Sequence, residues 1–137
     1  CDNLGCLWFK GLLHIAYGHH LRQELCGRFD GVAIRVPIPV GSLSDMTFVM
    51  NKDVTVEEVN KALEEESATA RYSDVVATTY DPIVSSDIVK SPYASTVDLS
   101  MTRVVDGDLL KVMTWYDNEW GFTNQMIRQI LEIKNHQ

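Results

Sequence analysis

The residues best suited to chemistry lie in the octet Trp115–Phe122, which reads Trp-Tyr-Asp-Asn-Glu-Trp-Gly-Phe. Asp117 or Asn118 could cap a helix that follows, because carboxylates and amides accept hydrogen bonds from the first N–H groups of a helix. Binding groups also gather on turns at the carboxyl ends of strands. The octet therefore has two interpretations, a capped turn stapled by aromatic side chains or a binding turn, and spacing alone favours the capped turn.

A second group of reactive side chains crowds into the first 26 residues. A zinc finger with two cysteines and two histidines has about twelve residues in its central gap. Only seven residues separate Cys6 from His14. We therefore expect no metal site and interpret residues 1–24 as a short buried apolar segment with a polar end. The cysteines and histidines concerned are Cys1, Cys6, His14, His19, His20 and Cys26.

A third candidate is Arg35, which lies among β-branched residues in the stretch Gly31–Val36. This stretch alternates in the way that is typical of a strand, and Pro37 and Pro39 after it would end ladder pairing. Arg35 could form a salt bridge at a sheet surface. It could equally bind an anion, because a planar guanidinium group suits bidentate recognition of phosphate.

The elements that must position these residues can be read from periodicity. Residues 109–116 alternate as a strand, and apolar residues recur every four positions from Phe122 to Ile130, as on one face of a helix. Asp106-Gly107 between residues 95–105 and 109–116 is typical of a two-residue β-hairpin turn. The second strand of the predicted hairpin would lead directly into the octet.

The rest of the chain adds two strands and a helix. Residues 46–50 and 75–79 are expected to be strands, and Thr55 with Glu58 forms the pattern of a capping box. The acidic residues that follow Thr55 are expected on the solvent face of that helix. Ser85-Ser86-Asp87 lacks the G-x-S-x-G context of a hydrolase, so we interpret it as a structural turn.

Composition excludes several classes of protein. The 137 residues have the size and composition of one globular domain, with a net charge of −7. The twelve lysines and arginines form no run, so we expect no nucleic-acid partner. The longest apolar run is too short to span a bilayer, and it lacks the basic leader and the small-residue cleavage site of a signal peptide. Three cysteines make no disulfide framework, which favours a reducing, cytoplasmic location.

Several of these motifs resemble glyceraldehyde-3-phosphate dehydrogenases. The octet is similar to that family's signature near the C-terminus, and residues 25–39 are similar to its L-x-G-K-L-x-G-x-A-x-R-V-P-x-P stretch. Residues 55–60 and 83–88 resemble two further family motifs in the right order. The resemblance implies an α+β fold, with a mostly antiparallel or mixed sheet covered by helices on one face.

The same resemblance implies an activity and a site. Family enzymes attack an aldehyde with a cysteine, pass a hydride to NAD or NADP and release the acyl group to phosphate. Cys1 would then be the nucleophile, Arg35 would bind phosphate, and Asn118 and Phe122 would contact the nicotinamide in a cleft shared with Arg35. The implied partners are a phosphorylated aldehyde, inorganic phosphate and, in the full-length enzyme, further subunits of a tetramer.

Two features depart from the family pattern. The chain has no G-x-G-x-x-G fingerprint, so we expect a partial enzyme without the Rossmann domain. Residues 1–24 match the family's motifs around the nucleophile and the base poorly. We therefore divide the chain into an atypical segment, 1–24, and a catalytic-domain segment, 25–137. The alternative function is a non-catalytic scaffold or interaction domain that kept the fold.

Overall fold

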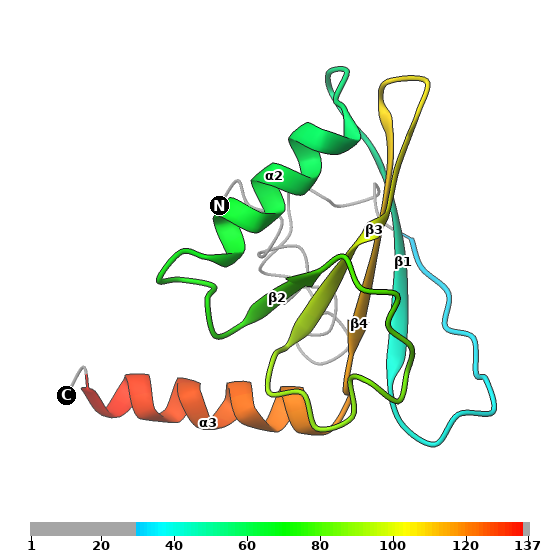
Figure 1. Ribbon diagram of the computed structural model, residues 1–137. Helices are drawn as coiled ribbons and strands as arrows, with labels where there is room; N and C mark the ends of the chain where they lie inside the picture. The colour runs from blue at the N-terminus through cyan, green and yellow to red at the C-terminus, as the bar shows by residue number, and fades with distance from the viewer. Residues whose placement is uncertain (1–29, 136–137) are drawn as a thin grey trace. The chain divides into compact units, whose positions relative to one another are not determined.

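The computed structural model describes residues 30–135, which fall in two units divided between Pro37 and Ile38. The second unit contains all of the helices and strands among the described residues (Figure 1). These are β1 (Ser42–Val49), α2 (Val56–Ser67), β2 (Val76–Thr79), β3 (Ser95–Val105), β4 (Leu109–Tyr116) and α3 (Trp120–Asn135).

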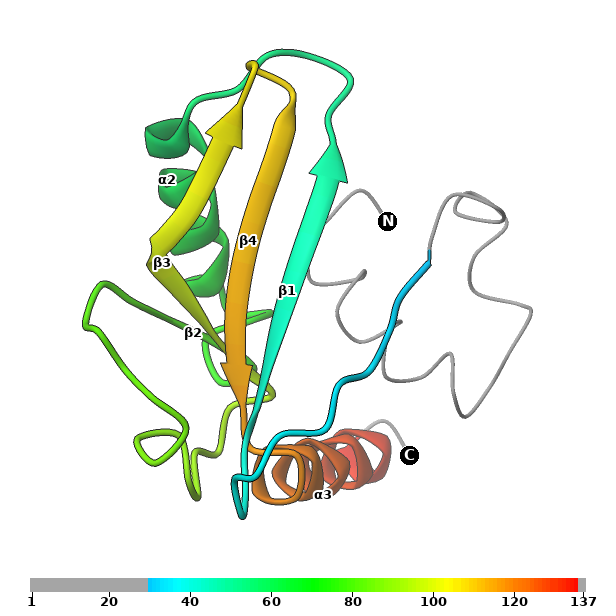
Figure 2. The ribbon, with the colours of Figure 1, turned by 90° about the vertical axis from the view of Figure 1, so that its right-hand side faces the viewer.

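The four strands form one mixed sheet in the order β1-β4-β3-β2 (Figures 1 and 2). β4 pairs antiparallel with both β1 and β3, whereas β2 runs parallel to β3. The expected α+β class with a mixed sheet is confirmed. β1, α2 and β2 form a strand–helix–strand unit with parallel strands, but β4 and β3 lie between these strands, unlike in the dinucleotide-binding fold, whose strands are neighbours.

The hairpin of β3 and β4 has the predicted strands but a longer loop. Val105 pairs with Leu109, which leaves the three residues 106–108 in the loop where a two-residue turn was predicted. Asp106 has a φ of 53° and Gly107 a φ of 81°. These left-handed conformations explain why an Asp-Gly pair stands here, since both residue types tolerate positive φ.

The hairpin loop also anchors the chain that enters α2. The Met50 N–H donates to the Asp108 carbonyl at 2.8 Å, and the Val54 N–H donates to the Gly107 carbonyl at 2.9 Å. Past these bonds, Thr55 caps α2 as predicted. Its hydroxyl accepts from the Glu58 N–H at 3.2 Å, and the Glu58 carboxylate accepts from the Thr55 N–H at 2.9 Å.

Helix α2 covers one face of the sheet and closes the hydrophobic core (Figure 2). Its Val59 is buried against the strands, while Glu57 and Glu64 on its other side are exposed, as predicted. Burial of each large core side chain contributes about 1.5–3 kcal/mol. The buried residues of this core cluster are Val59, Val97, Leu99, Leu110 and Val112.

Strand β3 contains a wide irregularity at its centre. Asp98 pairs with Met113, and the pairing resumes only at Arg103 opposite Lys111, so four residues of β3 lie opposite one residue of β4. The Asn60 amide of α2 donates to the Leu99 carbonyl at 3.0 Å inside this bulge. The bulge is thus bonded to the helix that covers it.

Two predicted strand positions are corrected. β1 begins at Ser42, four residues before the predicted Met46, because Ser42 already pairs with Tyr116 of β4. The strand predicted at residues 31–36 is wrong: this segment has no strand structure, and its side chains are exposed, Val32 by 86%. Alternation indicates an extended chain, but a strand also needs a neighbour with free backbone groups.

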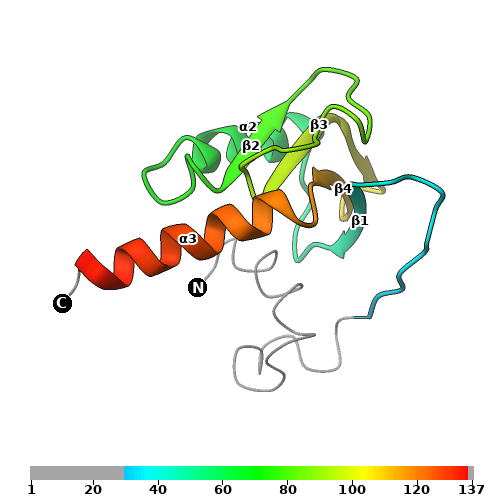
Figure 3. The same ribbon diagram turned by 90° about the horizontal axis from the view of Figure 1, so that it is seen from below.

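Helix α3 is formed where predicted, yet its apolar residues do not face the rest of the domain. Seen from below, it extends away from the end of β4 (Figure 3). Gly121, Gln125 and Arg128 contact the rest of the domain, and their spacing places them on one side of the helix. The exposed side carries Phe122, Met126, Ile127, Ile130, Leu131 and Ile133.

Candidate functional site

The predicted binding turn joins β4 to α3 and is built around the carboxylate of Asp117. Asp117 is only 4% exposed. Its Oδ1 accepts hydrogen bonds from the Glu119 N–H at 2.9 Å and the Trp120 N–H at 2.8 Å. The predicted cap is therefore confirmed, with Asp117 as the capping residue, and the carboxylate lies at the positive end of the helix dipole.

The second oxygen of Asp117 binds a distant loop. Oδ2 accepts from the Lys90 N–H at 2.8 Å, and Lys90 has the left-handed φ of 64° that is uncommon for a lysine. Burial raises the pKa of Asp117, but the N–H groups of Trp120, Lys90 and Glu119 lower it, and the net pKa lies below the ordinary aspartate value. Asp117 is therefore a carboxylate at neutral pH.

Asn118 lies beside this carboxylate and is exposed. Its Oδ1 accepts from the Gly41 N–H at 3.1 Å, a bond between residues 77 positions apart. Because this bond uses the amide oxygen, the Nδ2 hydrogens remain the donors that Asn118 can offer to a ligand. Such a donor suits a carbonyl or carboxamide oxygen.

Gly41 must be a glycine to make this bond. Its φ is 97°, and a Cβ built on it would lie 2.9 Å from Ile88 Cδ1 and 3.4 Å from the Ser85 carbonyl oxygen. Ser85 and Ile88 belong to the loop that ends at Lys90. This loop contains the predicted Ser-Asp turn, in which the Val84 N–H donates to Asp87 Oδ2 at 2.7 Å.

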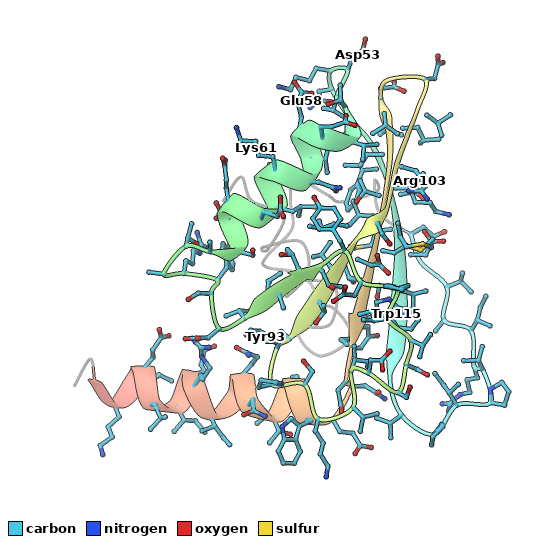
Figure 4. The ribbon with its side chains drawn as sticks, in the orientation of Figure 1. Asp53, Glu58, Lys61, Tyr93, Arg103 and Trp115 are labelled. Carbon is cyan, nitrogen blue, oxygen red and sulfur yellow. The ribbon has the colours of Figure 1, made fainter. Side chains whose placement is uncertain are left out.

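Gly121 brings the start of α3 directly against the loop that precedes β3. A Cβ on Gly121 would overlap with the Tyr93 carbonyl oxygen, and the Ser91 carbonyl oxygen would lie 3.5 Å away. Tyr93 is labelled beside the start of α3 in Figure 4. Further along, Gln125 Nε2 donates to the carbonyls of Asp74 and Pro92 at 3.1 and 3.2 Å. The turn is thus held by contacts of Asp117 and Asn118 before α3 and by contacts of Gly121 and Gln125 within α3.

Of the expected site residues, only Asn118 has a described partner in this cluster. Phe122 lies on the exposed side of α3, one residue past Gly121, and is 47% exposed. Arg35 is exposed and belongs to the other unit, so the cleft expected between Arg35 and Asn118 stays a prediction. Cys1 lies outside the described residues.

Sequence reasoning missed Gly41, Lys90, Tyr93 and Gly121 as parts of this cluster. Gly121 carried a usable signal, since a glycine in the first turn of a helix costs about 1 kcal/mol relative to alanine and so suggests a close contact. Gly41 and Lys90 have no such signal in the sequence, because their contacts are made with residues far away along the chain.

Between residues 30 and 135, no three histidine, cysteine, aspartate or glutamate side chains come together in a way that could hold a metal ion. The cysteines and histidines of the first 26 residues, for which no metal site was expected, lie outside that range. Neither α2 nor α3 has the length and apolar character that a membrane-spanning helix requires.

Comparison with known proteins gives one consistent match. The family described as "Glyceraldehyde 3-phosphate dehydrogenase, C-terminal domain" matches residues 19–118. Glyceraldehyde-3-phosphate dehydrogenases of Zymomonas mobilis and Haloarcula vallismortis are each 47% identical over 104 residues, covering 76% of this chain and 31% and 30% of those proteins. A Streptomyces avermitilis relative, "Glyceraldehyde-3-phosphate dehydrogenase 2", is 42% identical over 112 residues, 82% of this chain and 33% of that protein.

The chain spans about a third of the length of these curated relatives. The matched segment includes β1, the capped helix α2, the β3–β4 hairpin and the turn as far as Asn118. The resemblance inferred from separate motifs therefore extends over most of one continuous domain. The chain belongs to the glyceraldehyde-3-phosphate dehydrogenase family and corresponds to its C-terminal domain.

Proposed function

We propose that this chain supplies the catalytic-domain part of a phosphorylating glyceraldehyde-3-phosphate dehydrogenase. The reaction would oxidise glyceraldehyde 3-phosphate to 1,3-bisphosphoglycerate through a thioester on Cys1, with inorganic phosphate as co-substrate. The observation that supports this most directly is the exposed amide of Asn118, held by the Gly41 N–H. A fixed amide donor at the end of a strand is suited to orienting the carboxamide of a nicotinamide.

The residues of this chain would have separate tasks. Asn118 would donate from Nδ2 to the carboxamide oxygen, and Phe122 would line the same pocket with its ring. Arg35 would bind phosphate through its planar guanidinium group. NAD or NADP, when bound, would supply the hydride acceptor. We expect the complete enzyme to be a cytoplasmic homotetramer.

The proposal can be tested by exchange into a complete relative. Residues 25–137 would replace the matching segment of the Zymomonas mobilis enzyme, and NADH formation would be followed at 340 nm with and without phosphate. We expect phosphate-dependent activity, and Asn118→Ala should raise the KM for NAD by about tenfold because one hydrogen bond to the ligand is lost.

Asn51→Ala is the matched control, since Asn51 is also an exposed asparagine but lies two residues beyond the C-terminal end of β1. It should leave KM unchanged. A folded exchange protein in which Asn118→Ala also has no effect on KM would refute the role of Asn118. An exchange protein that folds but shows no phosphate-dependent activity would refute the assignment of residues 25–137 to the catalytic domain of such an enzyme.

A second function is favoured by one observation, the exposed apolar side of α3. Exposed apolar surfaces of this kind are typical of interaction sites. In this alternative the chain is a non-catalytic scaffold derived from the same fold. Calorimetric titration of the isolated 137-residue chain with NAD tests the scaffold alternative. We expect no measurable NAD binding, and micromolar binding would contradict a non-catalytic scaffold function.

A further inference from the structure

Three segments that are far apart in the sequence close a ring of contacts around Asn118. Asp117 binds the Lys90 N–H at one end of the 84–90 loop. Within that loop, Ile88 and Ser85 leave no room for a side chain on Gly41. Gly41 in turn donates its N–H to Asn118, the neighbour of Asp117. The contacts therefore run from Asp117 to the 84–90 loop, from that loop to Gly41, and from Gly41 to Asn118, which is next to Asp117 in the sequence.

We propose that Asp117 is a positioning residue for Asn118, acting by holding the 84–90 loop against Gly41. This inference rests on the ligand-binding role proposed for Asn118, which gives the positioning its purpose. The amide of Asn118 is exposed, so packing does not fix its rotamer. Its orientation depends on the Gly41 N–H, and the place of Gly41 depends on the loop.

The chemistry of aspartate suits this task because the two carboxylate oxygens are used in different directions. Oδ1 caps α3, and Oδ2 reaches the Lys90 N–H. Serine is also a good capping residue, but it has a single oxygen. Asparagine has one acceptor oxygen, and its NH₂ group would face the Lys90 N–H, donor against donor. Only a short carboxylate accepts on both sides here.

The loop transmits the effect through backbone geometry. Lys90 has a φ of 64°, a conformation that a non-glycine residue keeps only where surrounding contacts hold it, whereas Gly41 adopts its φ of 97° freely because it has no Cβ. Ile88 is buried at 3% exposure, so the loop is packed and not merely tethered. When Oδ2 is removed, we expect Lys90 to relax, the loop to move away from Gly41 and the Gly41 N–H to lose its fixed direction.

The test compares Asp117→Ser with Asp117→Ala in the isolated 137-residue chain, using amide hydrogen exchange measured by NMR. In Asp117→Ser the Trp120 N–H should stay protected because serine still caps the helix. The N–H groups of Lys90 and Gly41 should exchange about tenfold faster, the effect expected when one hydrogen bond is lost. In Asp117→Ala all three should exchange faster.

Two variants establish the direction of the effect. Asn118→Ala should expose the Gly41 N–H and leave the Lys90 N–H protected. Ile88→Val removes the methyl group nearest to Gly41 and leaves Asp117 intact, so it tests the same link if the Asp117 variants do not fold. It should speed exchange at Gly41 alone, and it should also shift the NH₂ resonances of Asn118. Asp45→Ser, an exposed aspartate on β1, is the matched control and should change neither N–H.

The proposal is overturned if Gly41 stays as protected in Asp117→Ser as in the wild-type chain, or if Ile88→Val leaves both Gly41 exchange and the Asn118 resonances unchanged. None of these measurements uses a ligand. If these exchange rates behave as expected but Asn118→Ala leaves the KM for NAD of the exchange protein unchanged, the ligand-binding role of Asn118 is refuted and the positioning role stands.

Discussion

Helices α2 and α3 both have an apolar side, but the domain uses them in opposite ways. α2 buries its apolar side against the sheet and turns its acidic side to solvent. α3 contacts the domain through Gly121, Gln125 and Arg128 and leaves its apolar side exposed. Periodicity therefore predicts which side of a helix is apolar. What covers that side depends on other segments of the protein.

The largest loss of stability that can test this difference between α2 and α3 is expected from a matched pair of leucine substitutions. Leu110, on β4 beneath α2, is 1% exposed, whereas Leu131 on α3 is 53% exposed. Leu110→Ala should lower the free energy of unfolding by about 2–5 kcal/mol, because it leaves a cavity in the core. Leu131→Ala should change it by less than about 0.5 kcal/mol. Urea denaturation would measure both, and equal losses would break the comparison.

A smaller effect is expected at the point where α3 is attached. Gly121→Ala should lower the free energy of unfolding by about 1–3 kcal/mol, because the new methyl group would overlap with the Tyr93 carbonyl. Helix propensity alone predicts the opposite sign, a gain of about 1 kcal/mol. The sign of the change in thermal unfolding therefore decides whether contact or propensity governs this turn. Gln129→Ala, at an exposed position of α3, serves as the control.

The start of α2 should contribute less than either of these. Thr55→Ala removes the hydroxyl that accepts from the Glu58 N–H, and should cost about 1 kcal/mol. Thr55→Ser keeps the hydroxyl and should restore most of that stability. Chemical denaturation of the two variants measures the cap, and an equal loss in both would show that the hydroxyl is not what matters.

The start of α3 adds a dependence on pH, which we expect to be the smallest of the four effects. The folded pKa of Asp117 is lowered, so the unfolded chain binds a proton more readily as pH falls. The carboxylate therefore stabilises the fold above the ordinary aspartate pKa, about 3.9, and this contribution is lost as pH falls through the lowered value. Asp117→Asn should flatten the acid side of the stability profile. An unchanged slope below about pH 4 would contradict this prediction.

Local patterns predicted much of the fold. The bounds of β3 and β4 follow from alternation interrupted by Asp106-Gly107, and the Thr55 capping box marks the start of α2. The strand expected at residues 31–36 was wrong because pairing is decided by a partner far away in the chain. Dependence on distant partners also explains why only part of the candidate site could be predicted. Asn118 stood out by its motif, whereas Gly41 and Lys90 matter only through contacts across the sequence.

The β3–β4 hairpin also bears on the order in which the domain assembles. Its strands are separated by three residues, so closing it costs little chain entropy and can take place early. The carbonyls of its loop then offer acceptors to Met50 and Val54, and β1 can add along β4 only after a much longer segment has closed. We therefore expect the hairpin to serve as the folding nucleus on which α2 and β1 are placed in turn.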